Sequence, residues 1–452
     1  MSNTVKLAPF LKVVKDITAT FSKVKKLDYL NSGEFPIIDQ SKNYIAGYTN
    51  NNSLINNWNN EEVVIFGDHT RVVKYVDFPI AIGADGVKVL KINSAISNSK
   101  YLYYFLKTTK IHDAGYSRHY KFLKALKIPI LPLAEQQKTA SFLTRIEALI
   151  QKRKESIQLL DELIKSTFLD MFGDPYNNKY KFPISTIGTL ASDVKYGTSA
   201  PANNNGVYPY LRMNNIDYNG FWNFKDLKYI NVDDSEKDKY LLRNGDLVFN
   251  RTNSRELVGK TAVYNKNNEI IIAGYLIRVR TNELANPWFI WGYLNSKIGK
   301  SVLFDLCNNI IGMANINATK LKAIQILIPP KQLQDKFASI VTKIEATKAK
   351  SQSSLDELNN LFNSTAQKAF KGELNLGNIK VIEKEISKEE SQVLDEDKVL
   401  ELIQSGSFEA KDYVNEKQNY DDIRDMVLKL MDEGKITQKF TDDKKMVLEI
   451  KQ

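Results

Sequence analysis

The sequence has few of the side chains that bind metals or form disulfides. It contains a single cysteine, Cys307, and three scattered histidines, His69, His112 and His119. One cysteine cannot form an internal disulfide, and so few soft ligands do not make a structural zinc site. The sequence therefore excludes a disulfide framework and predicts no metal centre.

Long apolar runs are also missing. The longest, such as Ile324–Pro330, are far shorter than the ~20 residues needed to cross a bilayer. The first fifteen residues carry three lysines and no apolar core of a signal peptide. Hydrophobic residues make up 43% and charged residues 26% of the 452 positions, as in ordinary globular proteins of two or three domains. We therefore expect a cytoplasmic protein with no membrane contact.

Motifs for nucleotide or base chemistry are absent as well. The sequence has no Gly-x4-Gly-Lys-Ser/Thr phosphate loop and no intact Asp/Asn-Pro-Pro-Tyr/Phe motif, which clamps a base for methylation. The nearest approach, Asp174-Pro175-Tyr176, directly follows a predicted helix and is read as a stop signal. No Ser/His/Asp constellation or carboxylate-lysine nuclease motif is present either. We therefore predict that the chain is not an enzyme, with no catalytic residues and no cofactor of its own.

What the sequence does have is positive charge, unevenly spread. The whole chain carries a net charge of +10. Residues 376–452 contain 13 Lys/Arg and 19 Asp/Glu, so residues 1–375 contain 50 and 34, a net charge of +16. A basic body of this size is typical of proteins that bind polyanions such as nucleic acid, although a solvated basic surface is the alternative.

The most informative feature is an internal duplication. Residues 128–147 match residues 326–345 at a constant offset of 198, and the match continues until Phe172 falls on Phe370. In the first copy, apolar residues recur every three or four positions over about 39 residues, so it predicts an amphipathic helix roughly 58 Å long. Two related helices with one apolar stripe each predict an antiparallel coiled coil, the alternative being that each packs only on its own globule. Because Ala346–Ser354 has few apolar residues, the seam should be loose there or open to another protein.

Weaker matches precede each helix, at offsets that increase along the chain. They indicate two similar globules of mixed α/β structure, the second with extra residues between shared segments. The matches are Phe35–Ile38 with Tyr208–Leu211 (offset 173), Glu62–Ile65 with Asp246–Phe249 (184) and Leu102–Leu106 with Ile290–Leu294 (188).

The predicted fold class is therefore α/β (α+β), with two similar domains joined by two long helices and followed by a small C-terminal module. Helices at Asp397–Gln404 and Tyr420–Met431, followed by two strands, suggest that this module is winged-helix-like. Its negative charge argues against DNA binding and favours protein docking. The predicted segments are 1–131 (first domain), 132–175 (first helix), 176–330 (second domain), 331–375 (second helix), 376–396 (charged linker) and 397–452 (C-terminal module).

Several segments resemble the specificity (S) subunits of type I restriction-modification systems. Pro132–Gln137 and Leu160–Pro175 are similar to the beginning and end of the repeat helices in that family. Three further segments are similar to its target-recognition domains. These are Phe35–Gln40, Ile65–Arg71 together with Gly83–Gly86, and Asn244–Arg251. The resemblance covers about residues 8–375 and stops at the C-terminal module.

The resemblance implies a DNA-recognition subunit without chemistry of its own. In that family, each target-recognition domain reads one half of a bipartite site in double-stranded DNA, through the major groove. The helix pair sets the separation of the two domains and docks two methyltransferase (modification) subunits. The resemblance places S-adenosylmethionine chemistry on those subunits, and ATP/Mg-driven cleavage on separate motor-nuclease (restriction) subunits where the system has them.

Candidate DNA-binding residues follow the matched strands in both domains. Reading base edges needs Arg or Lys for guanine and Asn or Gln for adenine, while Lys, Arg and hydroxyl groups hold phosphates. For each candidate, the alternative is a solvated loop or turn residue. In the first domain the candidates are Gln40, Lys42, His69, Thr70 and Arg71. In the second they are Arg212, Asn214, Asn215, Arg251, Thr252, Asn253 and Arg255.

Three other functions remain open on the sequence alone. A stand-alone sequence-specific DNA-binding regulator could use the same two domains without any methyltransferase. An enzyme with cryptic nuclease or methyltransferase chemistry would show cofactor-dependent activity as a purified chain. A structural adaptor would carry its basic charge incidentally.

Overall fold

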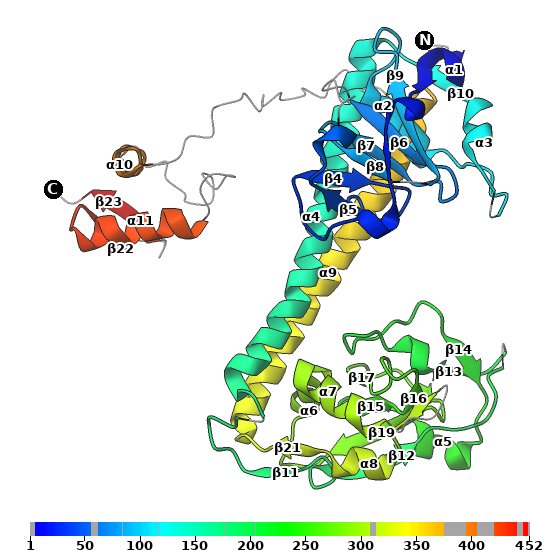
Figure 1. Ribbon diagram of the computed structural model, residues 1–452. Coiled ribbons are helices and arrows are strands. Elements are labelled where there is room, and N and C mark those ends of the chain that lie inside the picture. The colour runs from blue at the N-terminus through cyan, green and yellow to red at the C-terminus, as the bar shows by residue number, and fades with distance from the viewer. Residues whose placement is uncertain are drawn as a thin grey trace. The chain divides into compact units, whose positions relative to one another are not determined.

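The computed structural model describes residues 5–55, 62–83, 85–115, 117–175, 177–203, 205–307, 313–374, 395–404, 420–440 and 446–450. The chain divides into two compact units, Met1–Leu374 and Asn375–Gln452. The first unit contains two globules and the two long helices that join them (Figure 1). No helix among the described residues is both long enough and apolar enough to span a membrane.

The first globule is built on two four-stranded sheets, with strand orders β2-β9-β6-β7 and β3-β8-β4-β5. The antiparallel pair of β1 and β10 closes it just before the first long helix begins. Its strands are β1 Lys6–Pro9, β2 Val14–Asp16, β3 Lys23–Val24, β4 Phe35–Ile38, β5 Gly47–Thr49, β6 Val63–Gly67, β7 Val73–Val76, β8 Ala81–Gly83, β9 Val87–Ile92 and β10 Lys127–Ile130. Its helices are α1 Phe10–Val13, α2 Ser99–Thr108 and α3 Tyr120–Lys124.

The second globule repeats this plan. Its sheets have the strand orders β12-β19-β15-β17 and β14-β13-β18, and the pair β11-β21 closes it as β1-β10 closes the first. Its strands are β11 Ile184–Thr186, β12 Ala191–Tyr196, β13 Tyr208–Leu211, β14 Lys228–Ile230, β15 Leu247–Asn250, β16 Thr252–Asn253, β17 Thr261–Val263, β18 Ile271–Ile272, β19 Leu276–Thr281, β20 Ala314–Asn315 and β21 Gln325–Leu327. Its helices are α5 Asp234–Tyr240, α6 Pro287–Asn295, α7 Lys297–Leu306 and α8 Ala318–Ala323.

The strand pairing confirms the duplication and corrects one of the predicted matches. β4 and β13 each pair in parallel with one neighbour and antiparallel with the other, which agrees with the offset of 173. The offset of 184 for β6 and β15 is wrong by one residue. Val64 packs on the α2 side of its sheet and Leu247 on the α6 side, whereas Val63 points the other way. Because successive residues in a strand face opposite sides, Val64 matches Leu247, and the offset is 183.

The long helices form the predicted antiparallel coiled coil. α4 spans Leu133–Phe172 and α9 spans Lys331–Phe370, which are 40 residues each and related by the offset of 198. Ile146, in the N-terminal half of α4, shares a buried cluster with Phe362, in the C-terminal half of α9. At the opposite ends, Phe168 packs edge-on against Phe337, with ring centres 5.5 Å apart. The two helices run side by side between the globules (Figure 1).

A buried glutamine ties each long helix to its own globule. Gln136 and Gln334 occupy equivalent positions and are fully buried. The amide of Gln136 donates to the carbonyl of Leu131 (2.8 Å) and accepts from the N–H of Asn98 (2.9 Å), which caps α2. Gln334 accepts in the same way from Asn286 (2.9 Å), the cap of α6. The glutamine at each helix entry therefore fixes the angle between the helix and its globule.

The middle of the seam is polar but closed. Lys348 lies on α9 within the stretch predicted to be loose, and its ammonium is 2.5 Å from the Asp161 carboxylate on α4. Both side chains are mostly buried, with 18% and 15% exposed. The ammonium also lies 3.8 Å from the centre of the Phe221 ring in the second globule. The expectation of an open seam is therefore wrong at Lys348, because an ion pair and an aromatic ring fill it.

The second unit has its own small core. Helices α10 (Glu396–Gln404) and α11 (Tyr420–Asp432) precede a hairpin of β22 (Ile436–Phe440) and β23 (Met446–Ile450). Val399, Ile423 and Ile436, one from each of three elements, are buried together. The order of helix, helix and hairpin agrees with the expected winged-helix-like module. Most of the predicted charged linker lies outside the described residues.

Candidate nucleic-acid interface

The two candidate loops of the first globule meet at one edge. Gln40 lies just beyond β4, and Thr70 lies in the tight turn between β6 and β7. The Thr70 hydroxyl donates to the backbone carbonyl of Gln40 at 2.6 Å, and the His69 N–H donates to the Gln40 side-chain oxygen at 3.2 Å. Lys42 and Thr70 are exposed, whereas Gln40 and His69 are half-buried. The fold therefore brings these four candidates onto one surface.

Arg71 ends the same turn in an unusual backbone conformation. Its φ is +62°, in the left-handed region that costs a non-glycine residue roughly 1–2 kcal/mol. The equivalent position in the second globule is Gly259 (φ +80°). The N–H of Arg71 donates to the carbonyl of Gly67 at the end of β6 (2.7 Å), and that of Gly259 to the carbonyl of Asn250 at the end of β15 (2.8 Å). The Arg71 guanidinium, 35% exposed, lies 2.8 Å from the Asp113 carboxylate. Because glycine would adopt this backbone conformation without cost, an arginine at this position suggests that its side chain has a function.

A buried histidine anchors this turn. His119 is fully buried, and its Nδ1 donates to the carbonyl of Asp68 at 3.0 Å. The Asp68 carboxylate accepts from the N–H of Tyr120 at 2.7 Å. The backbone N–H of Asp68 donates to the carbonyl of Gly86 at 2.6 Å. Hydrogen bonds from the interior of the globule to Asp68 therefore fix the turn that carries His69, Thr70 and Arg71.

In the second globule, the loop after β13 is braced by one of its own candidates. Asn215 is 1% exposed, and its side-chain oxygen accepts from the N–H of Arg212 at 2.9 Å. Its amide group donates to the carbonyls of Asn223 (2.9 Å) and Asp226 (3.2 Å). Loop backbone therefore occupies the polar atoms of Asn215, and a DNA contact by this residue stays a prediction. Asn214 is exposed.

Arg212 remains available beside it. Its guanidinium, 27% exposed, donates to the Asp226 carboxylate at 3.0 Å. The carboxylate partner is 71% exposed, so the pair lies at the surface. A surface pair of this kind contributes little stability and exchanges readily for another acceptor.

The loop after β15 presents two arginines on aromatic rings. The Arg251 guanidinium lies 4.9 Å from the centre of the Tyr196 ring and donates to the Asn315 side-chain oxygen at 3.3 Å. The exposed Arg255 guanidinium lies 3.7 Å from the centre of the Phe304 ring. Stacking on a ring holds the flat guanidinium in place while its edge stays free to donate hydrogen bonds.

The other two candidates in this loop differ in access. Thr252 is 8% exposed because β16 pairs with β20 there. Its side chain is therefore largely inaccessible in this structure, and a DNA contact by Thr252 stays a prediction. Asn253 is half-buried, and its side-chain oxygen accepts from the N–H of Ser254 at 2.9 Å.

Comparison with known proteins places this fold in a family. Residues 5–159 and 177–360 each match the family model described as Type I restriction modification DNA specificity domain. The chain belongs to this family. Each matched segment contains one globule and most of the long helix that follows it, so the chain has two specificity domains. The matches end before the second unit.

Individual relatives agree with this assignment. The chain is 26% identical over 272 residues to the type I restriction enzyme EcoKI specificity subunit of Escherichia coli K12, covering 55% of this chain and 58% of that protein. It is 26% identical over 271 residues to the StySPI specificity subunit of Salmonella potsdam, with the same coverage. The chain thus spans less than two thirds of the length of these relatives. The S subunit of a type I system from M. genitalium has the same fold, with a TM-score of 0.53 and 16% identity over 82% of this chain and 97% of that one.

Sequence reasoning missed two exposed tyrosines in the second specificity domain. Tyr196 ends β12 and is 40% exposed, and Tyr275 precedes β19 and is 53% exposed. The N–H of Arg251 donates to the carbonyl of Tyr275 at 3.0 Å, so both tyrosines flank this arginine. The two tyrosines are 55 and 24 positions from Arg251 in the chain, and the pairing of β19 with both β12 and β15 brings them together.

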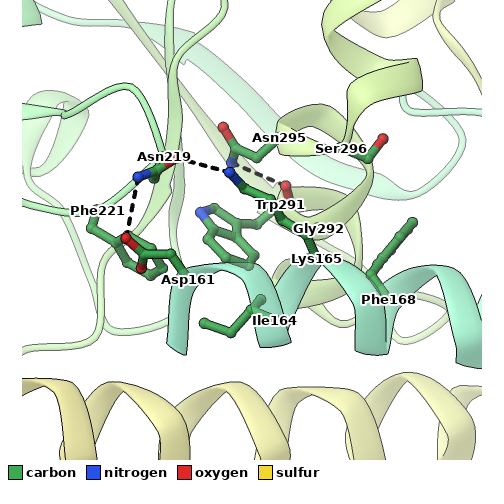
Figure 2. A pocket seen from close by; sticks show the side chains of 10 residues that line it. All are labelled: Asp161, Ile164, Lys165, Phe168, Asn219, Phe221, Trp291, Gly292, Asn295 and Ser296. Carbon is green, nitrogen blue, oxygen red and sulfur yellow. Dashed lines mark hydrogen bonds between the residues drawn. The ribbon is translucent and has the colours of Figure 1, made fainter. Parts of the chain in front are cut away.

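Close to the coil, the second specificity domain is fastened by polar contacts. Figure 2 shows a small pocket between α4 and α6, lined mainly by Phe168, Phe221 and other apolar groups. At its edge, the Asn219 amide donates to the Asp161 carboxylate at 3.2 Å and accepts from the Lys165 ammonium at 3.1 Å. These contacts tie the loop of residues 217–221 to the same α4 side chain that pairs with α9.

Proposed function

We propose that this chain is the DNA-recognition subunit of a type I restriction-modification complex and reads a bipartite target in double-stranded DNA. The observation that carries the proposal is the repetition of one loop pair. Each specificity domain presents a loop after its parallel-paired strand (β4 or β13) and another after its central strand (β6 or β15). The scaffold is the same while the polar residues differ, as two different half-sites require.

The arginines in these loops are suited to reading guanine. Arg71, Arg212 and Arg251 each donate to a side-chain acceptor at or near the surface, so the guanidinium is already oriented, and a guanine edge with two acceptors can replace that partner. The excess of positive charge in residues 1–375 would supply the attraction to phosphates that is independent of base sequence. The three pairs are Arg71–Asp113, Arg212–Asp226 and Arg251–Asn315.

In this proposal the coiled coil is the ruler between the half-sites. Forty residues at about 1.5 Å per residue give each helix a length of about 60 Å. Both specificity domains pack on both helices, because α2 and α6 each contact α4 and α9. The length of the coil would therefore set the number of unread base pairs.

The coil also has surface for protein partners. Leu149, Leu159 and Leu163 on α4 are 52%, 62% and 49% exposed. Large apolar side chains that gather on an otherwise polar surface are typical of docking sites. We assign this surface to two methyltransferase subunits, with motor-nuclease subunits joining where the system restricts DNA. The chain itself would be non-catalytic, with S-adenosylmethionine and ATP/Mg bound by those partners.

A genome-wide map of methylated adenines tests the proposal. Cells making the chain with its methyltransferase should show a two-part motif with a fixed gap, which cells without the chain lack. Arg71→Ala should relax one half of the motif and Arg251→Ala the other, each by roughly 1–3 kcal/mol per lost base contact. Lys154→Ala, an exposed change on α4, is the control and should leave both halves intact.

Two outcomes would contradict it. If an active, bound methyltransferase produced no chain-dependent motif, a stand-alone DNA-binding regulator would become the better explanation. If Arg251→Ala weakened binding equally on all DNA sequences, this arginine would be a phosphate contact rather than a base reader.

A further inference from the structure

A buried lysine lies beneath the first candidate loop of the first specificity domain. Lys74, on β7, is only 4% exposed. Its ammonium donates to the backbone carbonyls of Asp39 (2.8 Å) and Asn43 (2.5 Å), and lies 4.0 Å from the Asp39 carboxylate. These carbonyls flank the loop that contains Gln40 and Lys42. The lysine therefore gathers the loop backbone around one positive charge.

The second specificity domain contains the same device. Lys260 is 7% exposed and directly precedes β17. Its ammonium donates to the backbone carbonyl of Met213 at 2.8 Å and also to that of Ile216. Both carbonyls belong to the loop after β13, which carries Arg212 and Asn214.

The two lysines do not occupy equivalent positions in the duplication. The backbone pairing that joins Gly67 to Val72 in the first domain joins Asn250 to Lys260 in the second, so Lys260 corresponds to Val72. The counterpart of Lys74 is Ala262. Residues two apart in a strand point to the same face, so either position can send a side chain under the loop. A lysine inherited from one ancestral copy would occupy the same position in both domains. Because the two lysines lie at positions two residues apart, we infer that the loop requires a buried ammonium group in each domain.

Burying an ammonium group costs free energy that an apolar residue at the same site would not. Burial lowers the pKa of both lysines, and the charges of Asp39 and Asp217 only partly oppose this shift. The structure shows the compensation, since each ammonium is held by carbonyls of the candidate loop. Each lysine also follows the second candidate loop of its domain closely in the chain, three residues after Arg71 and five after Arg255, so it connects both loops of its domain.

We propose that Lys74 and Lys260 are positioning residues that fix the backbone of the recognition loops, one for each half of the DNA target. This inference rests on the proposed function and deepens it. The ammonium groups do not touch DNA. They hold the loop backbone so that Gln40 and Lys42, or Arg212 and Asn214, meet the groove in one orientation. A different loop conformation would present different donors, so each lysine governs the specificity of its own half-site.

The test uses Lys74→Met and Lys260→Met, which remove the ammonium but keep most of the side-chain volume. Amide hydrogen exchange of the full chain reports loop order without any DNA. Binding of the chain with its methyltransferase to duplexes that are altered in one half-site reports recognition. Lys260→Met should speed exchange in residues 212–216 alone and reduce discrimination about tenfold in one half-site. Lys74→Met should do the same for residues 39–44 and the other half-site.

A relocated lysine separates positioning from general stability. The double change Lys260→Val and Ala262→Lys places the ammonium where Lys74 has it, and should restore slow exchange and discrimination. Unchanged exchange in Lys260→Met would overturn the proposal, as would equal losses at both half-sites. Failure of the unaltered chain to discriminate half-sites would overturn the proposed function instead, whatever the loops do in hydrogen exchange.

Discussion

Glu345 offers a sharp test of the junction between the coil and the second specificity domain. Its counterpart in the first half of the chain, Glu147, accepts hydrogen bonds from the hydroxyls of Tyr104 (2.9 Å) and Tyr103 (3.4 Å) and from Lys107. In the second half the corresponding residues of α6 are Gly292, Trp291 and Asn295. One Glu345 oxygen is buried and has no hydrogen-bond partner among the described residues, and the Lys348 ammonium is 3.9 Å away.

This environment raises the pKa of Glu345 from 4.5 to about 7. Burial is the main cause, Asp161 and Asp217 add to it, and Lys348 opposes it. Between these two pH values the folded chain binds a proton that the unfolded chain has released. The free energy of unfolding therefore falls as pH rises through this range, and the full penalty is present above pH 7. A shift of this size corresponds to about 3 kcal/mol, since one pKa unit is about 1.4 kcal/mol.

Glu345→Gln removes the charge and should remove this pH dependence. We expect the variant to be more stable than the unaltered chain by up to about 3 kcal/mol at pH 8, and by little at pH 5. Urea unfolding of the full chain at both pH values measures the difference. Glu147→Gln is the matched control and should destabilise by roughly 1–3 kcal/mol, because it weakens hydrogen bonds to a charged acceptor. No gain for Glu345→Gln at pH 8, or an equal gain at pH 5, would refute the reasoning.

Three further predictions concern packing and length. Gly292→Ala should destabilise by roughly 1–3 kcal/mol in thermal unfolding, because its Cβ would lie 2.5 Å from the Phe168 ring; unchanged stability would show that α6 can move away. Gln334→Leu should cost about 1–3 kcal/mol by leaving buried backbone groups unpaired, whereas changing an exposed polar residue of α9 should cost almost nothing. Deleting seven matched residues from both α4 and α9 shortens the coil by about 10 Å and should shorten the unread gap by about three base pairs. Altered half-sites in that variant would contradict the proposal that the coil sets only the distance between them.

The sequence by itself determined the architecture, because repetition and helical periodicity are properties of the chain. The constant offset of 198 predicted two equal helices, and α4 and α9 have equal lengths at that offset. The order of globule, helix, globule and helix allows the two helices to lie antiparallel. The structure has this arrangement, since Ile146 of α4 shares a buried cluster with Phe362 of α9. The predicted candidate loops also lie where the matched strands end, after β4 and β6 in the first domain and after β13 and β15 in the second. These results rest on patterns that span tens of residues, which local variation does not obscure.

Tertiary structure alone decided which loop residues are accessible and which groups hold them. In short strands a one-residue change of register moves every side chain to the other face, so the match of β6 with β15 could be corrected only from packing. A polar loop residue satisfies its hydrogen bonds with water or with nearby backbone, and the sequence does not distinguish these. Asn215 and Thr252 proved to be buried, whereas Tyr196 proved to be exposed. The burial of a charged side chain such as Lys74, Lys260 or Glu345, and the groups that surround it, depend on residues that are distant in sequence and adjacent only in the folded chain.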